Sequence, residues 1–498
     1  MTKERFILAV DQGTSSSRSI VFDKHGNIVA SHQVEVPTIY LRDGWTEQNP
    51  EDIWDTTVQS IGKTLEKIDK LGGEVAAIGI ANQRETTLLW DRRTGVPIYN
   101  AILWHDRRTA GTCHKLITDG WENTIQQKTG LLLDPYFSAT KISWILNNVD
   151  GSRVKSERGS SIFGTVDSFL LWRLTGGAIH ATDATNASRT SLFNIHQCRW
   201  DEELLQLFQI PPNCLPSVFD SSHYFGETDP SLFGRKIPIL GIIGDQQASA
   251  LGHGCVDAGS AKSTYGTGCF LMINTGSLAL RSSNRLLTTI AYKINGSTSY
   301  ATEGSIFVAG EAVKWLRDGL EIISEANEVE HLAESGPERD DLYLVPAFSG
   351  LGAPHWNPHV RGALYGITGT TARTELARAA LDASCYQTSD ILRAAHKDGN
   401  QVSRLRVDGG MSANNWFLQR LSDILDISVE RPKLTETTAW GAAYVAGLGL
   451  KDSFFSSLAE IKSISTTDSK FIPSMTEERR SKLLNGWDIA VQRTLATF

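Results

Sequence analysis

Two short turns that combine glycine with hydroxyl side chains could bind phosphate groups. The first, at residues 11–17, reads Asp-Gln-Gly-Thr-Ser-Ser-Ser, and the second, at residues 265–268, reads Tyr-Gly-Thr-Gly. Each lies between apolar runs typical of strands, so consecutive backbone N–H groups would point to one side of a tight bend. Glycine permits close approach, and the hydroxyl groups add donors. One such turn is usually a plain hairpin, but two opposed turns could hold a polyphosphate from both sides.

A third turn could seat the rest of a nucleotide. A short apolar strand at residues 405–407 is followed by Asp408-Gly409-Gly410 and by a helix predicted to begin near Asn414. Glycines and a helix N-terminus suit a ribose or a phosphate. An ordinary strand-to-helix turn with an asparagine cap is the alternative. The P-loop motif GxxxxGK[ST] does not occur, which disfavours a P-loop enzyme.

Charged side chains at the ends of two apolar strands could recognise or activate a polyhydroxy substrate. Arg84 and Glu85 follow the strand at residues 78–81, and Asp245 follows the apolar run at residues 237–244. An arginine beside a glutamate offers donors and acceptors for hydroxyl groups. The alternatives are a solvated ion pair for Arg84 and Glu85 and a helix N-cap for Asp245.

Alternating strand and helix patterns would position these turns. Up to about residue 250 the pattern predicts strands at residues 5–13, 17–36 and 75–91 and an amphipathic helix at residues 50–68. The segment 258–276 then repeats the strand, glycine turn and strand of the first turn, and helices are expected at residues 303–323 and 370–397. The sequence therefore predicts a mixed α/β protein with two domains, 1–253 and 254–498, and a cleft between them.

Composition excludes several classes of function. The 498 residues carry a net charge of −8, which argues against nucleic acid or an anionic membrane as a partner. The apolar runs are too short for a membrane span or a signal peptide. Six scattered cysteines without a CxxC pair favour reduced thiols over a disulfide framework or a zinc site. We therefore expect a cytoplasmic enzyme that acts on small molecules.

Several stretches, taken together, resemble the FGGY family of carbohydrate kinases, which belongs to the superfamily of hexokinase, actin and the Hsp70 chaperones. They are GWTEQNPEDIW, GIANQRETTLLWD, PIYNAILWHDRRT, GLLLDPYFSATKISWIL, TDATNASRT, GDQQASALG, STYGTGCFLMINTG and DGGMSANN. The resemblance covers the chain from about residue 5 to 450 and is most similar to members that phosphorylate glycerol. It implies two ribonuclease-H-like domains, each a mixed sheet flanked by helices, around a deep cleft for ATP and substrate.

The resemblance also implies a reaction and a set of site residues. ATP and Mg²⁺ would serve the phosphorylation of glycerol to sn-glycerol 3-phosphate, with Asp245 as general base and both Asp11 and Asp245 near the metal. The implied substrate residues are Arg84, Glu85, Trp104, Tyr136, Asp245, Gln246 and Phe270. The implied nucleotide residues are Thr14, Ser15, Ser16, Arg18, Thr267, Gly310, Lys314, Gly410, Met411 and Asn415. Without the resemblance, Trp104 and Phe270 would be expected in the core.

The chain departs from the family pattern at a few positions. Lys314 stands where an uncharged residue such as glutamine is common, and Met411 where a small residue is common. The region at residues 229–241 is poor in glycine, so the inhibition by fructose 1,6-bisphosphate seen in some members is not assumed. His223 is interpreted as an exposed loop histidine rather than a phosphorylation site.

Two alternative functions remain at this point. One is another FGGY kinase that acts on a pentulose or a longer polyol, and the other is an actin-like or Hsp70-like protein that uses ATP only to change conformation. Arg84, Glu85 and Asp245 argue against the conformational switch, which needs no substrate pocket. The family habit suggests a homodimer or a homotetramer.

Overall fold

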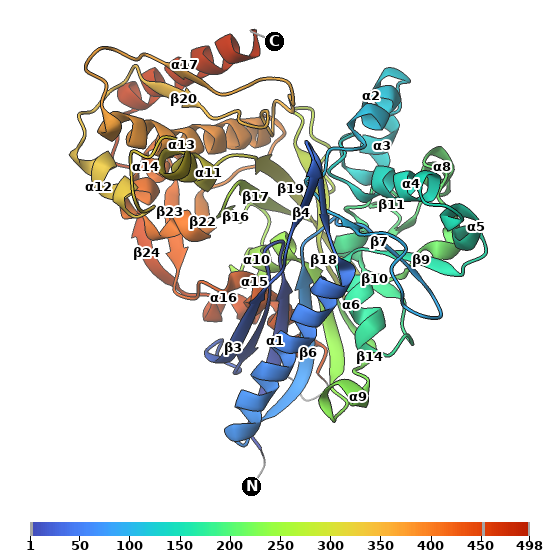
Figure 1. Cartoon of the computed structure of the whole chain (residues 1–498). Helices are drawn as coiled ribbons and strands as arrows, with labels where there is room; N and C mark the ends of the chain where they lie inside the picture. The colour runs from blue at the N-terminus through green and yellow to red at the C-terminus, as the bar shows by residue number, and fades with distance from the viewer. Residues whose placement is uncertain (1–2, 451–453, 497–498) are drawn as a thin grey trace.

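Two sheets carry most of the strands of the protein, whose computed structural model describes residues 3–450 and 454–496 (Figure 1). The first sheet has the order β14-β15-β6-β1-β2-β3, and its strands are β1 (Arg5–Gln12), β2 (Ser16–Phe22), β3 (Ile28–Glu35), β6 (Glu74–Asn82), β14 (Ser222–Glu227) and β15 (Pro238–Gly244). The second has the order β18-β19-β17-β16-β22-β23-β24, and its strands are β16 (Ala261–Tyr265), β17 (Cys269–Gly276), β18 (Leu287–Ile294), β19 (Ser297–Ile306), β22 (Arg404–Asp408), β23 (Ser428–Pro432) and β24 (Thr467–Phe471).

The two sheets repeat one topology. From β14 to β3, successive neighbours pair antiparallel, parallel, parallel, antiparallel and antiparallel. From β24 to β19 the same series recurs, and β18 extends that edge. The repeat predicted from the segment 258–276 is therefore confirmed, and it places the two glycine turns at equivalent hairpins, β1 to β2 and β16 to β17.

Two helices cross where the halves meet. Helix α10 (Asp245–Gly252) follows β15, and α15 (Thr437–Leu448) follows β23 at the equivalent place in the second sheet. Glycines bring their backbones into contact: a Cβ added at Gly441 would lie 1.9 Å from the carbonyl oxygen of Ala248, and one added at Gly252 would lie 1.9 Å from that of Thr437. Helix α15 is apolar on all sides, and it packs against β1, β6 and β15 of the first sheet.

Other helices cover the remaining faces. Helix α1 (Pro50–Lys70) lies along the opposite face of the first sheet, and its N-cap Asn49 accepts a hydrogen bond from the Glu51 N–H at 3.1 Å. The second sheet is covered by α13 (Arg373–Lys397) and α14 (Asn415–Leu425), with α17 (Glu477–Leu495) packed outside them (Figure 1). The helices expected at residues 50–68 and 370–397 are thus confirmed.

The remaining elements are short and form the lobe beside the first sheet and the connections around the second. Up to residue 233 they are β4 (Ile39–Arg42), β5 (Trp45–Gln48), β7 (Leu88–Asp91), β8 (Ala101–Ile102), α2 (Ala110–Thr118), α3 (Glu122–Thr129), α4 (Ser138–Asn148), α5 (Ser152–Glu157), β9 (Ser161–Gly164), α6 (Val166–Leu174), β10 (Ala181–Asp183), α7 (Ala184–Ala187), β11 (Phe193–Asn194), β12 (Arg199–Trp200), α8 (Glu202–Leu207), η1 (Pro212–Cys214), β13 (Ser217–Phe219) and α9 (Pro230–Phe233). After residue 306 they are α11 (Gly310–Lys314), η2 (Trp315–Gly319), α12 (Glu328–Ser335), β20 (Tyr343–Val345), β21 (Ala363–Tyr365), η3 (Gly410–Ala413), η4 (Leu458–Glu460) and α16 (Ile461–Ile464).

Two local predictions were wrong. The helix expected at residues 303–323 begins only at Gly310, because residues 303–306 complete β19, which is paired on both sides by β17 and β18. Strand pairing there outweighs a local sequence pattern that is compatible with both a helix and a strand. His223 is not an exposed loop residue: it lies half-buried in β14, where its ring stacks on Phe219 with centroids 4.2 Å apart.

Two further observations bear on the expectations from composition. All six cysteines are free thiols in the structure. Over residues 3–450 and 454–496, no helix combines the length and the apolarity needed to cross a membrane.

Candidate active site

The first glycine turn connects β1 to β2 and presents hydroxyl groups at the surface. The Gly13 N–H donates to the Ser16 carbonyl at 2.9 Å, which closes the turn, and Ser15 at its tip is exposed. The Thr14 hydroxyl accepts a hydrogen bond from Trp104 Nε1 at 2.9 Å. Arg18 forms an ion pair with Glu436, which precedes α15. The turn therefore links an aromatic side chain of the first half to the start of α15.

The second glycine turn is in backbone contact with two other segments. The Gly310 N–H donates to the Gly266 carbonyl at 3.0 Å, and the Ala309 N–H donates to the Thr267 carbonyl at 2.9 Å. A Cβ added at Gly310 would lie 2.6 Å from the Gly266 oxygen. At Gly409, where φ is +86°, a Cβ would lie 2.4 Å from the Tyr265 oxygen. The glycines are therefore required by backbone contacts between the turn, α11 and the loop after β22.

Three expected nucleotide residues differ in their surroundings. Met411 lies beside Gly310, with its Cγ 3.8 Å from the position of a Cβ there. The Lys314 side chain is 57% exposed, and its nearest charged partner is Glu311 at 3.7 Å. Asn415 begins α14 and accepts a hydrogen bond from Arg431 at 3.0 Å. Met411 thus lies beside the second turn, whereas Lys314 and Asn415 contact residues outside it.

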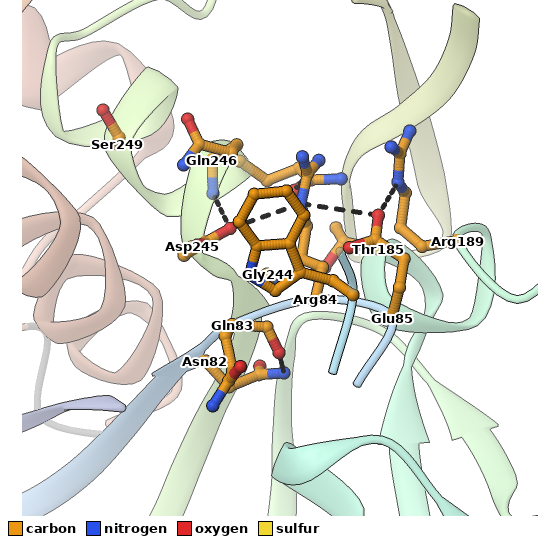
Figure 2. A network of polar contacts seen from close by, with 12 residues as sticks. Asn82, Gln83, Arg84, Glu85, Thr185, Arg189, Gly244, Asp245, Gln246 and Ser249 are labelled. Atoms are coloured by element: carbon orange, nitrogen blue, oxygen red, sulfur yellow. Dashed lines mark hydrogen bonds and ion pairs between the residues drawn. The ribbon is translucent and has the colours of Figure 1, made fainter. Parts of the chain in front are cut away.

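Asp245 stands at the end of β15 as the first residue of α10 (Figure 2). Its Oδ1 accepts a hydrogen bond from the Gln246 N–H at 2.6 Å and lies 3.2 Å from Arg84 Nε. The side chain is 26% exposed. Burial raises the pKa of Asp245, while the charges of Arg84 and Lys262 oppose that shift. A carboxylate held in this way is suited to accept a proton.

Asp11 is a second carboxylate of the same site. Burial, followed by the negative charge of Asp245, raises the pKa of Asp11 to about 7. Within the described residues, no group of three or more histidine, cysteine or acidic side chains could hold a metal ion unaided. Two repelling carboxylates nevertheless fit Mg²⁺, which binds through one or two carboxylates together with waters and phosphate oxygens.

Four charged side chains form a buried cluster that we call the charge ring: Arg84, Glu85, Arg189 and Glu303. Arg84 binds Glu303 through two contacts, Nη1–Oε2 at 2.7 Å and Nη2–Oε1 at 3.0 Å. Arg189 donates to Glu85 at 2.6 Å and to Glu303 at 3.0 Å. No member is more than 2% exposed. Although burial alone would raise the pKa of Glu303, the charges of Arg189 and Arg84 lower it to about 2.

Figure 2 shows how the ring continues into the catalytic candidate. Ion pairs run from Asp245 to Arg84, from Arg84 to Glu85 at 3.9 Å, and from Glu85 to Arg189. Glu85 adopts a positive φ of 61°, a conformation that costs a non-glycine residue free energy and that surrounding contacts must maintain. The residues after β6 are thus fixed by charged partners on several sides.

An aromatic group lies against the ring. The Trp104 ring centroid is 5.6 Å from that of Tyr136 and 5.8 Å from that of Phe270. Arg84 Nη2 lies 3.4 Å from the Tyr136 hydroxyl. The structure therefore brings together Arg84, Glu85, Trp104, Tyr136, Asp245, Gln246 and Phe270, and it draws them from both halves of the chain.

Lys262 is a site residue that the sequence reasoning missed. Its Nζ donates to Gln246 Oε1 at 2.5 Å and to Thr264 Oγ1 at 2.9 Å. Burial lowers the pKa of Lys262, and the charges of Asp408 and Asp245 oppose that shift. A lysine inside a strand that leads into a glycine turn was the available signal.

The motif TDATNASRT contains further missed residues. Asp183 caps α7, the Thr185 hydroxyl accepts the Gly244 N–H at 2.8 Å, and Asn186 exchanges hydrogen bonds with Asn82. Arg189 is the arginine of the charge ring. The sequence indicates these residues only through the resemblance, because their partners lie far away along the chain.

Comparison with known families matches both halves of the chain. The profile of the FGGY family of carbohydrate kinases, N-terminal domain, matches residues 6–252, and that of the C-terminal domain matches residues 261–450. The chain is 56% identical to a glycerol kinase of Rhodospirillum centenum, with 98% of each chain covered. It is 54% identical to glycerol kinase 1 of Pseudomonas aeruginosa, again with 98% of each covered.

Solved structures share the fold. The glycerol kinase of Plasmodium falciparum, crystallised with ADP, is 37% identical and superposes with a TM-score of 0.93 over 99% of both chains. A xylulose kinase of Lactobacillus acidophilus reaches a TM-score of 0.89 at 21% identity, covering 99% of this chain and 98% of that one. The second likeness shows the fold alone, and it includes the two-sheet arrangement described above.

Proposed function

This chain belongs to the FGGY family of carbohydrate kinases, and we propose that it transfers the γ-phosphoryl group of ATP to glycerol, giving sn-glycerol 3-phosphate. The observation that carries this proposal is the position of Asp245, 3.2 Å from Arg84 and beside the end of β6. The glycerol kinases that match over nearly the whole chain support the choice of substrate.

A small polyol would be held by paired hydrogen bonds and an apolar wall. Arg84 and Tyr136 supply donors, Glu85 supplies an acceptor, and Gln246 lies next to Asp245. Trp104 and Phe270 would pack against the carbon chain, since both are partly exposed and face one another.

Asp245 then acts as the general base. It accepts the proton of the terminal hydroxyl as that oxygen attacks the γ-phosphorus in line with the leaving group. The burial that raises its pKa makes the carboxylate a better proton acceptor than an exposed aspartate. Arg84 keeps Asp245 oriented through the contact at 3.2 Å.

The glycine turns hold the nucleotide. We assign the phosphates to Thr14, Ser15, Ser16, Arg18 and Thr267, and the remainder of the nucleotide to Gly310, Lys314, Gly410, Met411 and Asn415. Asp11 and Asp245 would hold Mg²⁺, which neutralises charge on the phosphate oxygens when bound. Opposed turns from two sheets position ATP from both sides, and phosphoryl transfer depends mainly on such positioning.

The proposal extends to organisation in the cell. Residues 1–253 would form a domain that carries the polyol site and the first turn, and residues 254–498 a domain that carries the second turn and the adenosine site. The protein would work in the cytoplasm as a homodimer or a homotetramer. Light scattering of the purified protein measures the assembly directly.

The test is ADP release with Mg²⁺ and ATP against glycerol, dihydroxyacetone, xylulose, ribulose and erythritol, for the wild type and for Asp245→Asn. We expect glycerol-dependent turnover that Asp245→Asn nearly abolishes. Turnover with xylulose or ribulose but not with glycerol would retain the mechanism and overturn the substrate. ADP release that ignores every polyol would overturn the kinase assignment in favour of a conformational switch.

A further inference from the structure

The motif at residues 182–190 has no part in the reaction as described so far, yet its residues contact Glu85, Glu303 and the residue before Asp245. Thr185 accepts the N–H of Gly244, the residue before Asp245, at 2.8 Å. The Ser188 hydroxyl lies 3.0 Å from the Thr289 hydroxyl on β18 of the second sheet. Arg189 contacts Glu85 and Glu303. Helix α7 and the two residues after it thus contact the backbone before Asp245, the loop after β6 and the second sheet.

The charge ring is assembled from both halves of the chain. Arg84 and Glu85 follow β6 of the first sheet and Arg189 follows α7, whereas Glu303 lies inside β19 of the second sheet, opposite Met272 and Leu287. Two cations and two anions balance one another without access to water. Buried charges of this kind persist only when each has a partner, so the ring fixes the relation between the two sheets at the substrate site.

We propose that Glu303 and Arg189 are positioning residues, which hold Arg84 and Glu85 in the orientation that binds glycerol. This inference rests on the proposed function. Glu303 occupies both terminal nitrogens of Arg84, which leaves Nε directed at Asp245 and the Nη2 edge beside Tyr136. Arg189 occupies Glu85 Oε1 and shares Glu303, so neither member of the substrate pair can turn away.

The geometry indicates what the loss of Glu303 would do. The Arg84 guanidinium would retain three neighbours that accept hydrogen bonds, namely Asp245, Glu85 and Gln247. Without its two-point contact to Glu303, the guanidinium would move toward the carboxylate of Asp245, because a buried cation is stable only beside an anion. The pocket would then lose the donor that faces the substrate while the nucleotide turns stay as they are.

A matched pair elsewhere in the chain separates positioning from general stability. Arg420 on α14 binds Asp382 on α13 through two contacts, at 2.7 and 3.0 Å, and both side chains are buried. This pair lies among helices that cover the second sheet, and it touches none of the proposed substrate residues. Asp382→Asn therefore breaks a buried two-point ion pair of the same kind without altering the charge ring.

The experiment compares Glu303→Gln, Arg189→Gln, the double variant and Asp382→Asn by steady-state kinetics, glycerol titration calorimetry and thermal melting. In Glu303→Gln, loss of charged hydrogen bonds should raise KM and Kd for glycerol about tenfold or more. KM for ATP should stay within about twofold, and Asp382→Asn should lower Tm while leaving both KM values near those of the wild type. The double variant restores charge balance, so its Tm should rise above that of either single variant while KM for glycerol stays high.

Three results would overturn the proposal. A wild-type KM for glycerol in folded Glu303→Gln would do so, as would recovery of KM together with Tm in the double variant, because both would assign the ring to stability alone. If Glu303→Gln is insoluble, Glu303→Asp supplies the test, since its shorter side chain cannot reach both arginines; an unchanged KM there would be the third such result. If glycerol did not increase turnover by the wild type, the proposed function itself would be wrong. The ADP-release assay with the polyol panel detects that outcome separately.

Discussion

The two sheets share a strand order but differ in what stands at equivalent strand ends. In the first sheet, β6 and β15 are followed by Arg84, Glu85 and Asp245, whose side chains contact one another. In the second sheet, the hairpin after β16 and the loop after β22 are built from glycines that bring backbone against backbone. The same repeat unit therefore carries charged side-chain contacts after its strands in one half and close backbone contacts in the other.

The two halves should therefore respond differently to amino-acid substitutions. A side-chain site can be altered residue by residue, because each group has its own partner. At Gly268, Gly310 and Gly409 an added Cβ would lie 2.4 to 2.6 Å from a backbone oxygen, so the constraint there is steric.

Asp245→Asn should lower kcat about 10³-fold, because it removes the proposed general base while keeping the side-chain shape. Since burial raises the pKa of Asp245, its charge is unfavourable in the folded protein, and Tm at pH 8 should not fall. Asp408→Asn, at the end of β22, is the control, because the pKa of Asp408 is held well below its usual value by His253 and Lys262 despite burial. It should lower Tm at pH 8. Equal losses of kcat and Tm in both variants would contradict the contrast.

Gly310→Ala should raise KM for ATP about tenfold with little change in KM for glycerol, since the new Cβ would lie 2.6 Å from the Gly266 oxygen and displace the second turn. Initial rates at varied ATP and at varied glycerol measure the two constants. Gly62→Ala on α1 is the control, because a Cβ there has no atom within 4 Å. A rise in the glycerol constant alone would show that the backbone half also serves the polyol.

Asp11→Asn should stabilise the ligand-free protein at pH 8 by about 2 °C in Tm. Burial and Asp245 raise the folded pKa of Asp11 from 3.8 to about 7, so the wild type loses stability as pH rises from about 4 to 7. The variant lacks this loss, and its advantage should be absent at pH 4 and complete above pH 7. Melting curves across this range check the prediction, and parallel curves would mean that burial and Asp245 do not raise the pKa of Asp11.

Lys314→Gln should change KM for ATP by less than about twofold, because the lysine is 57% exposed and its nearest charged partner is Glu311. The measurement is KM for ATP at low and high salt. A tenfold rise in KM at low salt would show that Lys314 reaches the phosphates once nucleotide is bound.

Much of the fold and part of the site could be predicted from local sequence. Short local patterns predict the glycine turns and the strands that precede Arg84 and Asp245, and this prediction needs no long-range contact. Family resemblance added Trp104, Tyr136 and Phe270, whose partners no local pattern reveals.

Glu303, Arg189 and Lys262 could not be found in this way. Arg84 and Glu303 are 219 positions apart, and Arg189 and Glu303 are 114 apart, so their pairing depends on the approach of two sheets. The same cause explains why the helix predicted at residues 303–323 was wrong. Residues 303–306 form a strand because they pair with β17 and β18, and the local sequence does not show this pairing.

The crossing of α10 and α15 has a consequence for dividing the chain. A fragment of residues 1–253 would lack α15, and the face formed by β1, β6 and β15 would be left as bare apolar surface. Such a fragment should aggregate when expressed alone, whereas co-expression with residues 254–498 would supply the missing cover. The gene could therefore be split near residue 253 only if both fragments are produced together, because each fragment covers apolar surface of the other.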